Sequence, residues 1–409
     1  MDATRPLLIH ELLPREIMGV IFEEHAKLKW NAPTIDGVVC RIWRKIVLNT
    51  PRAWTYLEIS NEDPPRIREL HEWLHWSGSA PLHIRFNKGP TVDERTIEQT
   101  LYYLLGGYHT RIASLRLLWG DPSFFEARDF PCLRLLEVDR WYSTHSPLRI
   151  VRWNSMHKLR SLRLPATKVF PLQWSELTQL ETLVLFSTTL PSLHQHSRSL
   201  VTLMLDIVSF EDAISSPVFF PSLTYLSLSR VRCLKPYIIA PCLVTYHEGW
   251  GNICESFSSP LPSLVEYGVY SPSIVDLDLA KWHHYFPNIL RLSIRVAPFL
   301  LISFLGSLSR DPHSLPVLQV ISAEWFDGPF AKQDRATMES LALIRREKCQ
   351  TDFVLCFERT LPFQIPLFFG EVSYCLSSDR KSLMHILEPG NPFLNVVGPS
   401  LAILSHLAH

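Results

Sequence analysis

Apolar residues at positions i, i+3 and i+5 recur along most of the chain. The residues in the middle of these triplets are Leu57, Leu115, Leu136, Leu162, Leu183, Leu203, Leu226, Tyr246, Tyr267, Leu292 and Ile321. From Leu115 to Leu292, successive middle residues are 20 to 26 residues apart. Alternation over i+3 and i+5 predicts a short strand with one buried face. The recurring triplet predicts that one strand-containing unit is repeated along the chain.

This period matches the roughly 20–29 residues of leucine-rich repeats, in which each unit is a strand followed by a helix or 3₁₀ turn. A proline two positions before the triplet predicts where a strand starts, because proline cannot donate within a sheet. Six units have one: Pro131, Pro221, Pro241, Pro262, Pro287 and Pro316. The repeats are irregular, since Glu248 takes an apolar position and a degenerate strand is expected at residues 82–86. An ordinary α/β domain with similarly spaced strands is the alternative interpretation.

Longer segments between the expected strands have helical periodicity. Helices are expected at residues 93–105, ending at Gly106, and at residues 299–308 and 337–348. Residues 353–357 read as a closing strand. The last stretch, about 50 residues, is expected either to cap the repeats or to be loosely structured. The expected fold class is therefore α/β, with a short helical domain at residues 5–52 and an irregular leucine-rich repeat solenoid with a cap at residues 53–409.

Composition narrows the classes of function. Of 409 residues, 46% are hydrophobic, and 40 Lys and Arg balance 40 Asp and Glu. Zero net charge gives no electrostatic reason to expect nucleic acid or an anionic membrane as a partner. Eight scattered cysteines without a C-x-x-C pair favour a reducing compartment. The first residues do not read as a signal peptide, and the most apolar run, residues 296–305, is shorter than a spanning helix. We therefore expect an intracellular protein of the cytoplasm or nucleus that binds no membrane.

Residues 9–54 do not follow the repeat. A first helix is expected around residues 14–22, with Pro14 at its start and Glu16 in its first turn. A second is expected at residues 38–48, with its inward side formed by Val39, Trp43, Ile46 and Val47. So few short helices have a small core, and they gain stability by docking on a partner or on the next domain.

This segment resembles an F-box, in particular the F-box of fungal proteins. The matching motifs are Leu13-Pro14-x-Glu16-Ile17 with Ile21-Phe22, then Val39-Cys40-Arg41-x-Trp43-Arg44-x-Ile46, Thr50-Pro51-Arg52-x-Trp54, and Ser77-Gly78-Ser79-x-Pro81-Leu82. The resemblance covers residues 9–86 and implies a substrate-recognition subunit of a Skp–cullin–F-box ubiquitin ligase, with an unidentified protein as target. It assigns the Skp-type adaptor a set of docking residues: Leu13, Pro14, Ile17, Ile21, Val39, Cys40 and Trp43. The same residues could instead only pack the helices together.

The resemblance is interrupted at residues 31–37, where such proteins carry a leucine-rich second helix. Pro33 and Gly37 are expected to weaken a helix there. The alternative hypothesis is therefore a leucine-rich-repeat interaction scaffold that is not part of a ligase and whose F-box is degenerate.

A third hypothesis is a zinc hydrolase. His71, Glu72 and His75 form an H-E-x-x-H motif, whose two imidazoles can share a zinc ion when they lie one helical turn apart. Trp73 and Trp76 beside them read as packing residues, and short motifs arise by chance. No G-x-S-x-G, P-loop or dinucleotide fingerprint is present. We therefore expect a binding protein that has no catalytic residue, no metal and no cofactor.

Strand residues outside the apolar triplets are expected to line the exposed strand face, the usual binding surface of a repeat array. The target-binding candidates on this face are Phe186, Met204, Tyr225, His247, Tyr270, Arg291 and Arg295. Aromatic side chains bordered by charge suit a protein or peptide ligand. A register shifted by one residue would exchange the two faces of each strand.

Overall fold

The computed structural model describes residues 12–60, 67–87, 94–117, 125, 128–139, 153–164, 177–186, 189–190, 193, 197–210, 216–231, 234–249, 257–270, 279–295, 298–325, 341, 344–345, 347, 353–359 and 371–377. The chain divides into two compact units, Met1–Thr188 and Thr189–His409. Both combine helices with parallel strands, so the chain belongs to the mixed α/β class.

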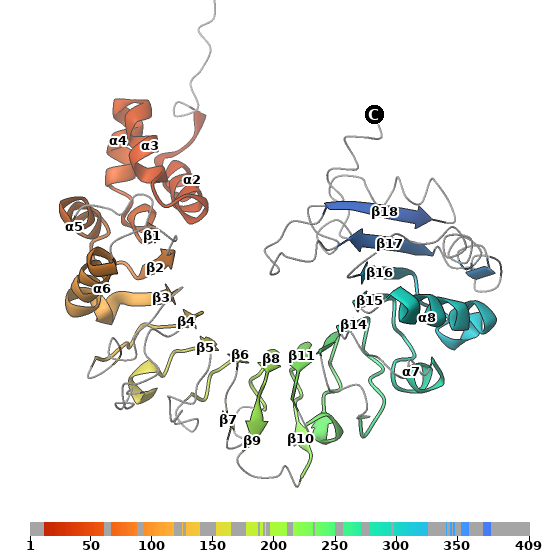
Figure 1. Cartoon of the computed structure of the whole chain (residues 1–409). Helices are drawn as coiled ribbons and strands as arrows, with labels where there is room; N and C mark the ends of the chain where they lie inside the picture. Colours follow the sequence, from red (N-terminus) through yellow and green to blue (C-terminus); the bar gives the residue numbers. More distant parts are fainter. Residues whose placement is uncertain are drawn as a thin grey trace, which may run out of the picture. The chain divides into compact units, whose positions relative to one another are not determined.

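The first unit begins with helices and continues with strands (Figure 1). Its helical elements are α2 (Arg15–Leu28), α3 (Ala32–Val39), α4 (Arg41–Leu48), η1 (Pro51–Trp54), α5 (Ile67–Trp76), α6 (Glu94–Tyr108), η2 (His109–Arg111) and η4 (Trp153–Met156). Its strands are β1 (Tyr56–Ser60), β2 (Leu82–Asn87), β3 (Ile112–Leu117), β4 (Leu135–Val138), β5 (Ser161–Leu164) and β6 (Thr182–Phe186). Each strand pairs in parallel with the next one in the sequence.

The second unit repeats this arrangement of parallel strands. Its long strands are β8 (Thr202–Asp206), β11 (Tyr225–Ser229), β13 (Thr245–Gly249), β14 (Glu266–Tyr270), β15 (Arg291–Arg295), β16 (Val320–Trp325), β17 (Val354–Arg359) and β18 (Glu371–Ser377). They pair in this order, and only β18 runs antiparallel to its neighbour. The short strands β7 (Thr189–Leu190), β9 (Ser209–Phe210), β10 (Val218–Phe219) and β12 (Ile238–Ile239) form two small sheets. The helical elements are η7 (Lys235–Tyr237), α7 (Leu279–Tyr285), α8 (Pro298–Arg310) and η8 (Pro312–Ser314).

The middle residues of the apolar triplets lie opposite one another in the sheet. In the first unit this row is Leu57, Ile84, Leu115, Leu136, Leu162 and Leu183. In the second unit it is Leu203, Leu226, Tyr246, Tyr267, Leu292, Ile321 and Leu355. All of these side chains are buried. Removal of each large aliphatic side chain from water contributes about 2 kcal/mol of transfer free energy. The predicted strand positions are therefore confirmed, including the degenerate strand at β2.

The prolines lie where the sequence pattern places them. The N–H of Leu133 donates to the carbonyl of Phe130, which makes Pro131 the second residue of a four-residue turn just before β4. The corresponding hydrogen bond, from the N–H two residues after the proline to the carbonyl of the residue before it, forms at Pro241, Pro262, Pro287 and Pro316. Proline suits the second position of such a turn because its φ is already fixed there.

The predicted weakness of a helix at residues 31–37 is wrong, because α3 forms at Ala32–Val39. Pro33 lies in the first turn, where a missing N–H costs no hydrogen bond. Gly37 faces α4: a Cβ there would lie 3.6 Å from Val47 Cγ1, and its carbonyl accepts from Arg44 Nε at 2.8 Å. Packing against α4 thus stabilises a segment whose intrinsic helix propensity is low.

Two further boundaries differ from the prediction. The expected helix at residues 38–48 is divided at Cys40, whose backbone is extended between α3 and α4. Val39 consequently ends α3 with an exposed side chain and does not point inward as predicted, whereas Ile46 and Val47 are buried. Helix α6 continues through Gly106 to Tyr108 instead of ending there. The helix α8 and the strand β17 agree with their predictions, and the helix expected at residues 337–348 is described only at positions 341, 344, 345 and 347.

Candidate docking surface on the N-terminal helices

Aromatic and aliphatic side chains hold the N-terminal helices together. Helix α2 buries Met18 and Phe22, and the ring of Phe22 lies 5.2 Å from that of Trp43 on α4. The indole of Trp54 in η1 is buried and donates to the Val47 carbonyl at 2.8 Å. The helices thus have a core of their own.

A polar contact joins α2 to α3. Nδ1 of His25 lies 3.1 Å from both carboxylate oxygens of Asp36, and the Asp36 side chain is buried. Burial raises the pKa of the Asp36 carboxyl above its usual value, and the hydrogen bond with His25 opposes that rise. The contact fixes α3 beside the carboxyl-terminal half of α2.

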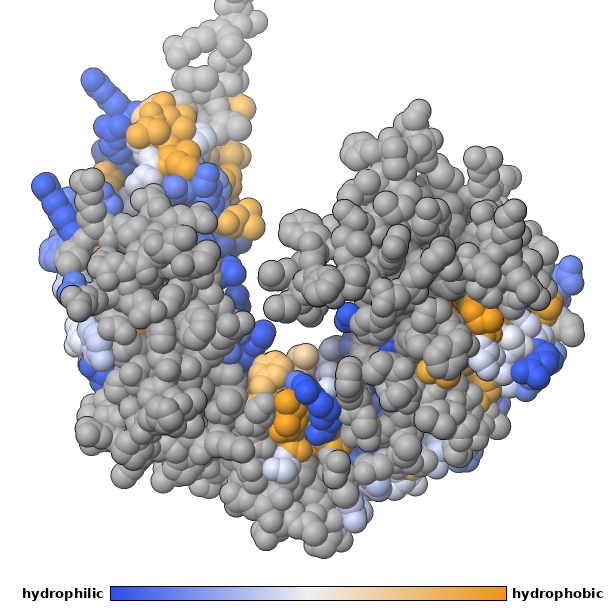
Figure 2. Space-filling view, in the orientation of Figure 1, coloured by the Kyte–Doolittle hydropathy of each residue, from blue (hydrophilic) through white to orange (hydrophobic). Residues whose placement is uncertain are grey.

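Exposed aliphatic side chains are concentrated on these helices. Of the fifteen large hydrophobic residues that are exposed in the described part of the chain, ten lie between residues 12 and 48. They are Leu12, Ile17, Val20, Ile21, Leu28, Ile35, Val38, Val39, Ile42 and Leu48. Figure 2 shows hydrophobic side chains gathered over α3 and α4. Apolar exposure on this scale in so short a segment is typical of a surface that another protein covers.

The docking residues implied by the F-box resemblance fall into two groups. Ile17, Ile21 and Val39 are 47%, 45% and 58% exposed, and Pro14 is also exposed. Leu13, Cys40 and Trp43 are half-buried. Ile17 and Ile21 are one turn apart on α2, so they share a side of that helix.

The half-buried candidates also have structural roles. Cys40 caps α4, because its sulfur accepts the backbone N–H of Trp43 at 3.4 Å. Trp43 packs on Phe22, so it belongs partly to the helical core. Seven exposed aliphatic residues of this segment were absent from the predicted docking set: Leu12, Val20, Leu28, Ile35, Val38, Ile42 and Leu48. The sequence could have indicated them, because these helices carry more aliphatic residues than one buried helix face requires.

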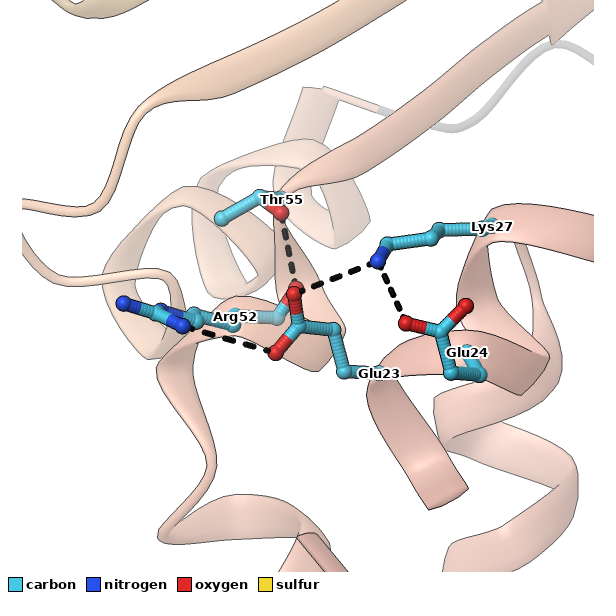
Figure 3. A network of polar contacts seen from close by, with 5 residues as sticks. All are labelled: Glu23, Glu24, Lys27, Arg52 and Thr55. Carbon is cyan, nitrogen blue, oxygen red and sulfur yellow. Dashed lines mark hydrogen bonds and ion pairs between the residues drawn. The ribbon is translucent and has the colours of Figure 1, made fainter. Parts of the chain in front are cut away.

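An ion-pair network borders the helices where η1 meets α2 (Figure 3). Glu23 lies 3.5 Å from Lys27 Nζ and 3.9 Å from Arg52 Nη1, and Lys27 also contacts Glu24. The Thr55 hydroxyl donates to the Arg52 carbonyl at 2.7 Å. Glu23 is 19% exposed, whereas Lys27, Glu24 and Arg52 are more exposed. Each pair with an exposed partner contributes little stability, but together the pairs orient η1 against α2.

The H-E-x-x-H motif lies on α5 with both imidazoles exposed. His71 and His75 face solvent, and Glu72 lies 3.5 Å from Arg68. Trp73 is buried, with its ring 4.9 Å from that of Trp54, so its predicted packing role is confirmed. The described residues include no group of three His, Cys, Asp or Glu side chains that could hold a metal ion. Among them, too, no helix is long and apolar enough to cross a membrane.

Two strand-face candidates of the second unit, Tyr225 and His247, are connected to each other and to Glu266 through polar contacts. The hydroxyl of Tyr225 lies 3.1 Å from Nδ1 of His247, whose Nε2 lies 3.4 Å from the Glu266 carboxylate. The hydrogen bond with His247 is the main reason that the pKa of Glu266 is lowered, and Arg291 contributes through its charge. Burial raises the pKa of Tyr225.

The remaining candidates are placed by register. Met204 and His247 lie in one row across the strands, on either side of Ser227. Tyr270 is paired with Arg295 on the adjacent strand. Met204, His247, Arg291 and Arg295 are half-buried. Phe186 belongs to β6 of the first unit, where the guanidinium of Arg163 lies 5.6 Å from its ring.

Comparisons with known proteins give no relative. No family model, no curated protein and no solved structure matches this chain.

Proposed function

We propose that this chain is the substrate-recognition subunit of a Skp–cullin–F-box ubiquitin ligase of the cytoplasm or nucleus. The N-terminal helices bind a Skp-type adaptor, and the exposed face of a leucine-rich repeat array binds the protein to be ubiquitinated. The observation that carries the proposal is the cluster of exposed aliphatic side chains on α2, α3 and α4, which includes Ile17, Ile21 and Val39 of the F-box-like motifs. Side chains of this kind are costly in water and are stabilised when a partner removes them from it.

In this role the chain catalyses no reaction. It holds a target close to the ubiquitin-charged enzyme and so raises their effective concentration. The parallel strands, each paired with the next in the sequence, support a repeat array, because each unit then contacts only its neighbours. The complete α3 favours an intact F-box over a degenerate one.

Adaptor binding tests the proposal. We expect a purified Skp-type adaptor to form a stoichiometric complex with the intact chain. Ile17→Asp/Ile21→Asp places two charges in that interface and abolishes the complex. Both side chains are exposed, so this variant leaves the helical core intact, which a change at Trp43 would not.

The matched control is Val201→Asp/Val244→Asp, which charges two exposed aliphatic positions of the second unit. This control keeps adaptor binding. The proposal fails if the intact chain does not bind the adaptor, and the chain is then an interaction scaffold outside the ligase. It also fails if the Ile17→Asp/Ile21→Asp variant binds as well as the control.

A further inference from the structure

A groove of about 1180 Å³ lies beside the N-terminal helices within the first unit. Side chains of α2, α4 and η1 form its walls, and the turn at residues 78–81 after α5 closes one side. Small residues make room in it. Gly19 is buried against Thr50, where a Cβ would approach Oγ1 to 3.2 Å, and Gly78 has a positive φ of 54°.

Positive charge predominates among the side chains that line this groove. Four of them are cationic, namely Arg15, Arg41, Lys45 and Arg52, and two are acidic, namely Glu16 and Glu23. The acidic side chain of Glu23 is already engaged by Lys27 and Arg52 (Figure 3). Arg15, Arg41 and Lys45 take part in no ion pair within the described part of the chain. A concave surface that holds such cations attracts negative charge.

Two exposed aliphatic side chains lie among these cations. Val20 of α2 and Ile42 of α4 line the groove and are 55% and 45% exposed. The described lining contains no aromatic ring on which a nucleic-acid base could stack. Cations interspersed with aliphatic side chains match a peptide with acidic and aliphatic residues better than they match a nucleic acid.

We infer that this groove is a binding site for an acidic peptide segment of a partner protein. Carboxylates of the segment pair with Arg15, Arg41 and Lys45, and its aliphatic side chains contact Val20 and Ile42. The cations that define the site are outside the docking set of the F-box resemblance. Val20 and Ile42 belong to the exposed aliphatic cluster that carries the proposed adaptor surface, so substitution of the cations, not of these two residues, tests the groove separately from adaptor binding.

The test measures binding of a fluorescein-labelled peptide rich in Glu with spaced Leu, titrated with the full-length chain at low and at physiological salt. We expect saturable binding that weakens as salt is added, because the contacts are ionic. The peptide with Gln in place of Glu is expected to bind at least roughly tenfold more weakly. Hydrogen exchange of the complex should show protection of residues 41–52 and 77–81.

Charge reversal at the groove provides the decisive comparison. Arg41→Glu/Lys45→Glu is expected to weaken binding of the Glu-containing peptide by at least roughly tenfold. The matched control Lys158→Glu/Arg198→Glu changes net charge equally at exposed positions elsewhere and should bind as the unaltered chain does. Equal loss in both variants, equal binding of the Gln peptide, or tighter binding of a single-stranded oligonucleotide would overturn the inference. A separate adaptor pull-down with the groove variant shows whether the two sites are independent.

Discussion

Lys235 Nζ lies 2.8 Å from Oε2 of Glu248, and the two side chains are 6% and 0% exposed. Glu248 stands in β13 where other repeat units have an apolar residue, and Lys235 of η7 supplies the opposite charge. The hydroxyl of Tyr267 donates to the same carboxylate oxygen at 3.1 Å. Burial and the Glu248 charge raise the pKa of Tyr267 well above its usual value, so its proton stays available for this hydrogen bond.

Removal of only one charge of this pair is expected to destabilise the second unit strongly. Lys235→Met leaves Glu248 buried without a cation, at a cost of about 3–5 kcal/mol in the free energy of unfolding. Urea denaturation measures this loss. Lys235→Met/Glu248→Leu removes both charges and is expected to recover most of it, because an apolar pair can replace a buried ion pair. A double variant as unstable as Lys235→Met would contradict the account.

The sequence pattern revealed Glu248 as an anomaly but could not reveal its partner. Thirteen residues separate Lys235 from Glu248, and nothing in the strand periodicity brings η7 next to β13. The register of the middle residues, in contrast, follows directly from the apolar period, because a one-residue shift would expose the whole row. Local pattern therefore predicted the strands, and tertiary contacts decided the exceptions.

The same distinction applies to the candidate site. Ile17 and Ile21 could be identified from an apolar stripe and a family resemblance. The exposure of Val39 could not, because it depends on the helix boundary at Cys40, where the sulfur caps α4. The formation of α3 also depends on a contact, that of Gly37 with Val47, which helix propensity does not include.

Stability of the first unit should decrease on mild acidification because of His83. Its ring stacks on Tyr56 at 4.7 Å, and burial lowers its pKa below the usual 6.5, with Lys27 and Arg134 acting in the same direction. The unfolded chain therefore takes up a proton at a higher pH than the folded chain does. The stabilising contribution of neutral His83 is complete above about pH 6.5, the pKa of the unfolded chain, and is lost as the pH falls through the lowered pKa of the folded chain.

Thermal unfolding at several pH values between neutral and mildly acidic measures this effect. His83→Phe keeps a ring for Tyr56 and removes the titrating group, so the unaltered chain should lose more stability on acidification than the variant. If the melting temperature falls equally with decreasing pH in the two proteins, His83 does not contribute.

A side chain at position 249 should strain the sheet of the second unit. A Cβ on Gly249 would lie 2.7 Å from Cβ and Oγ of Ser229 on the neighbouring strand. Gly249→Ala is therefore expected to lower the free energy of unfolding by roughly 1–3 kcal/mol. The matched control is Gly106→Ala in α6, where no atom lies within 4 Å of the added Cβ. That change should be neutral or stabilising by about 0.5–1 kcal/mol, and equal losses at both positions would refute the steric explanation.

Relief of backbone strain should stabilise the second unit at Ile207. This residue follows β8 with a φ of 55°, a left-handed conformation that is unfavourable for a β-branched side chain. Ile207→Asn is expected to raise the free energy of unfolding by about 1 kcal/mol, because asparagine tolerates this conformation and the lost side chain is 43% exposed. Val244→Asn is the matched control: Val244 is 40% exposed, and it is not among the described residues with positive φ. The control should be neutral or slightly destabilising in urea denaturation. If both variants shift stability in the same direction by the same amount, the gain does not come from the backbone.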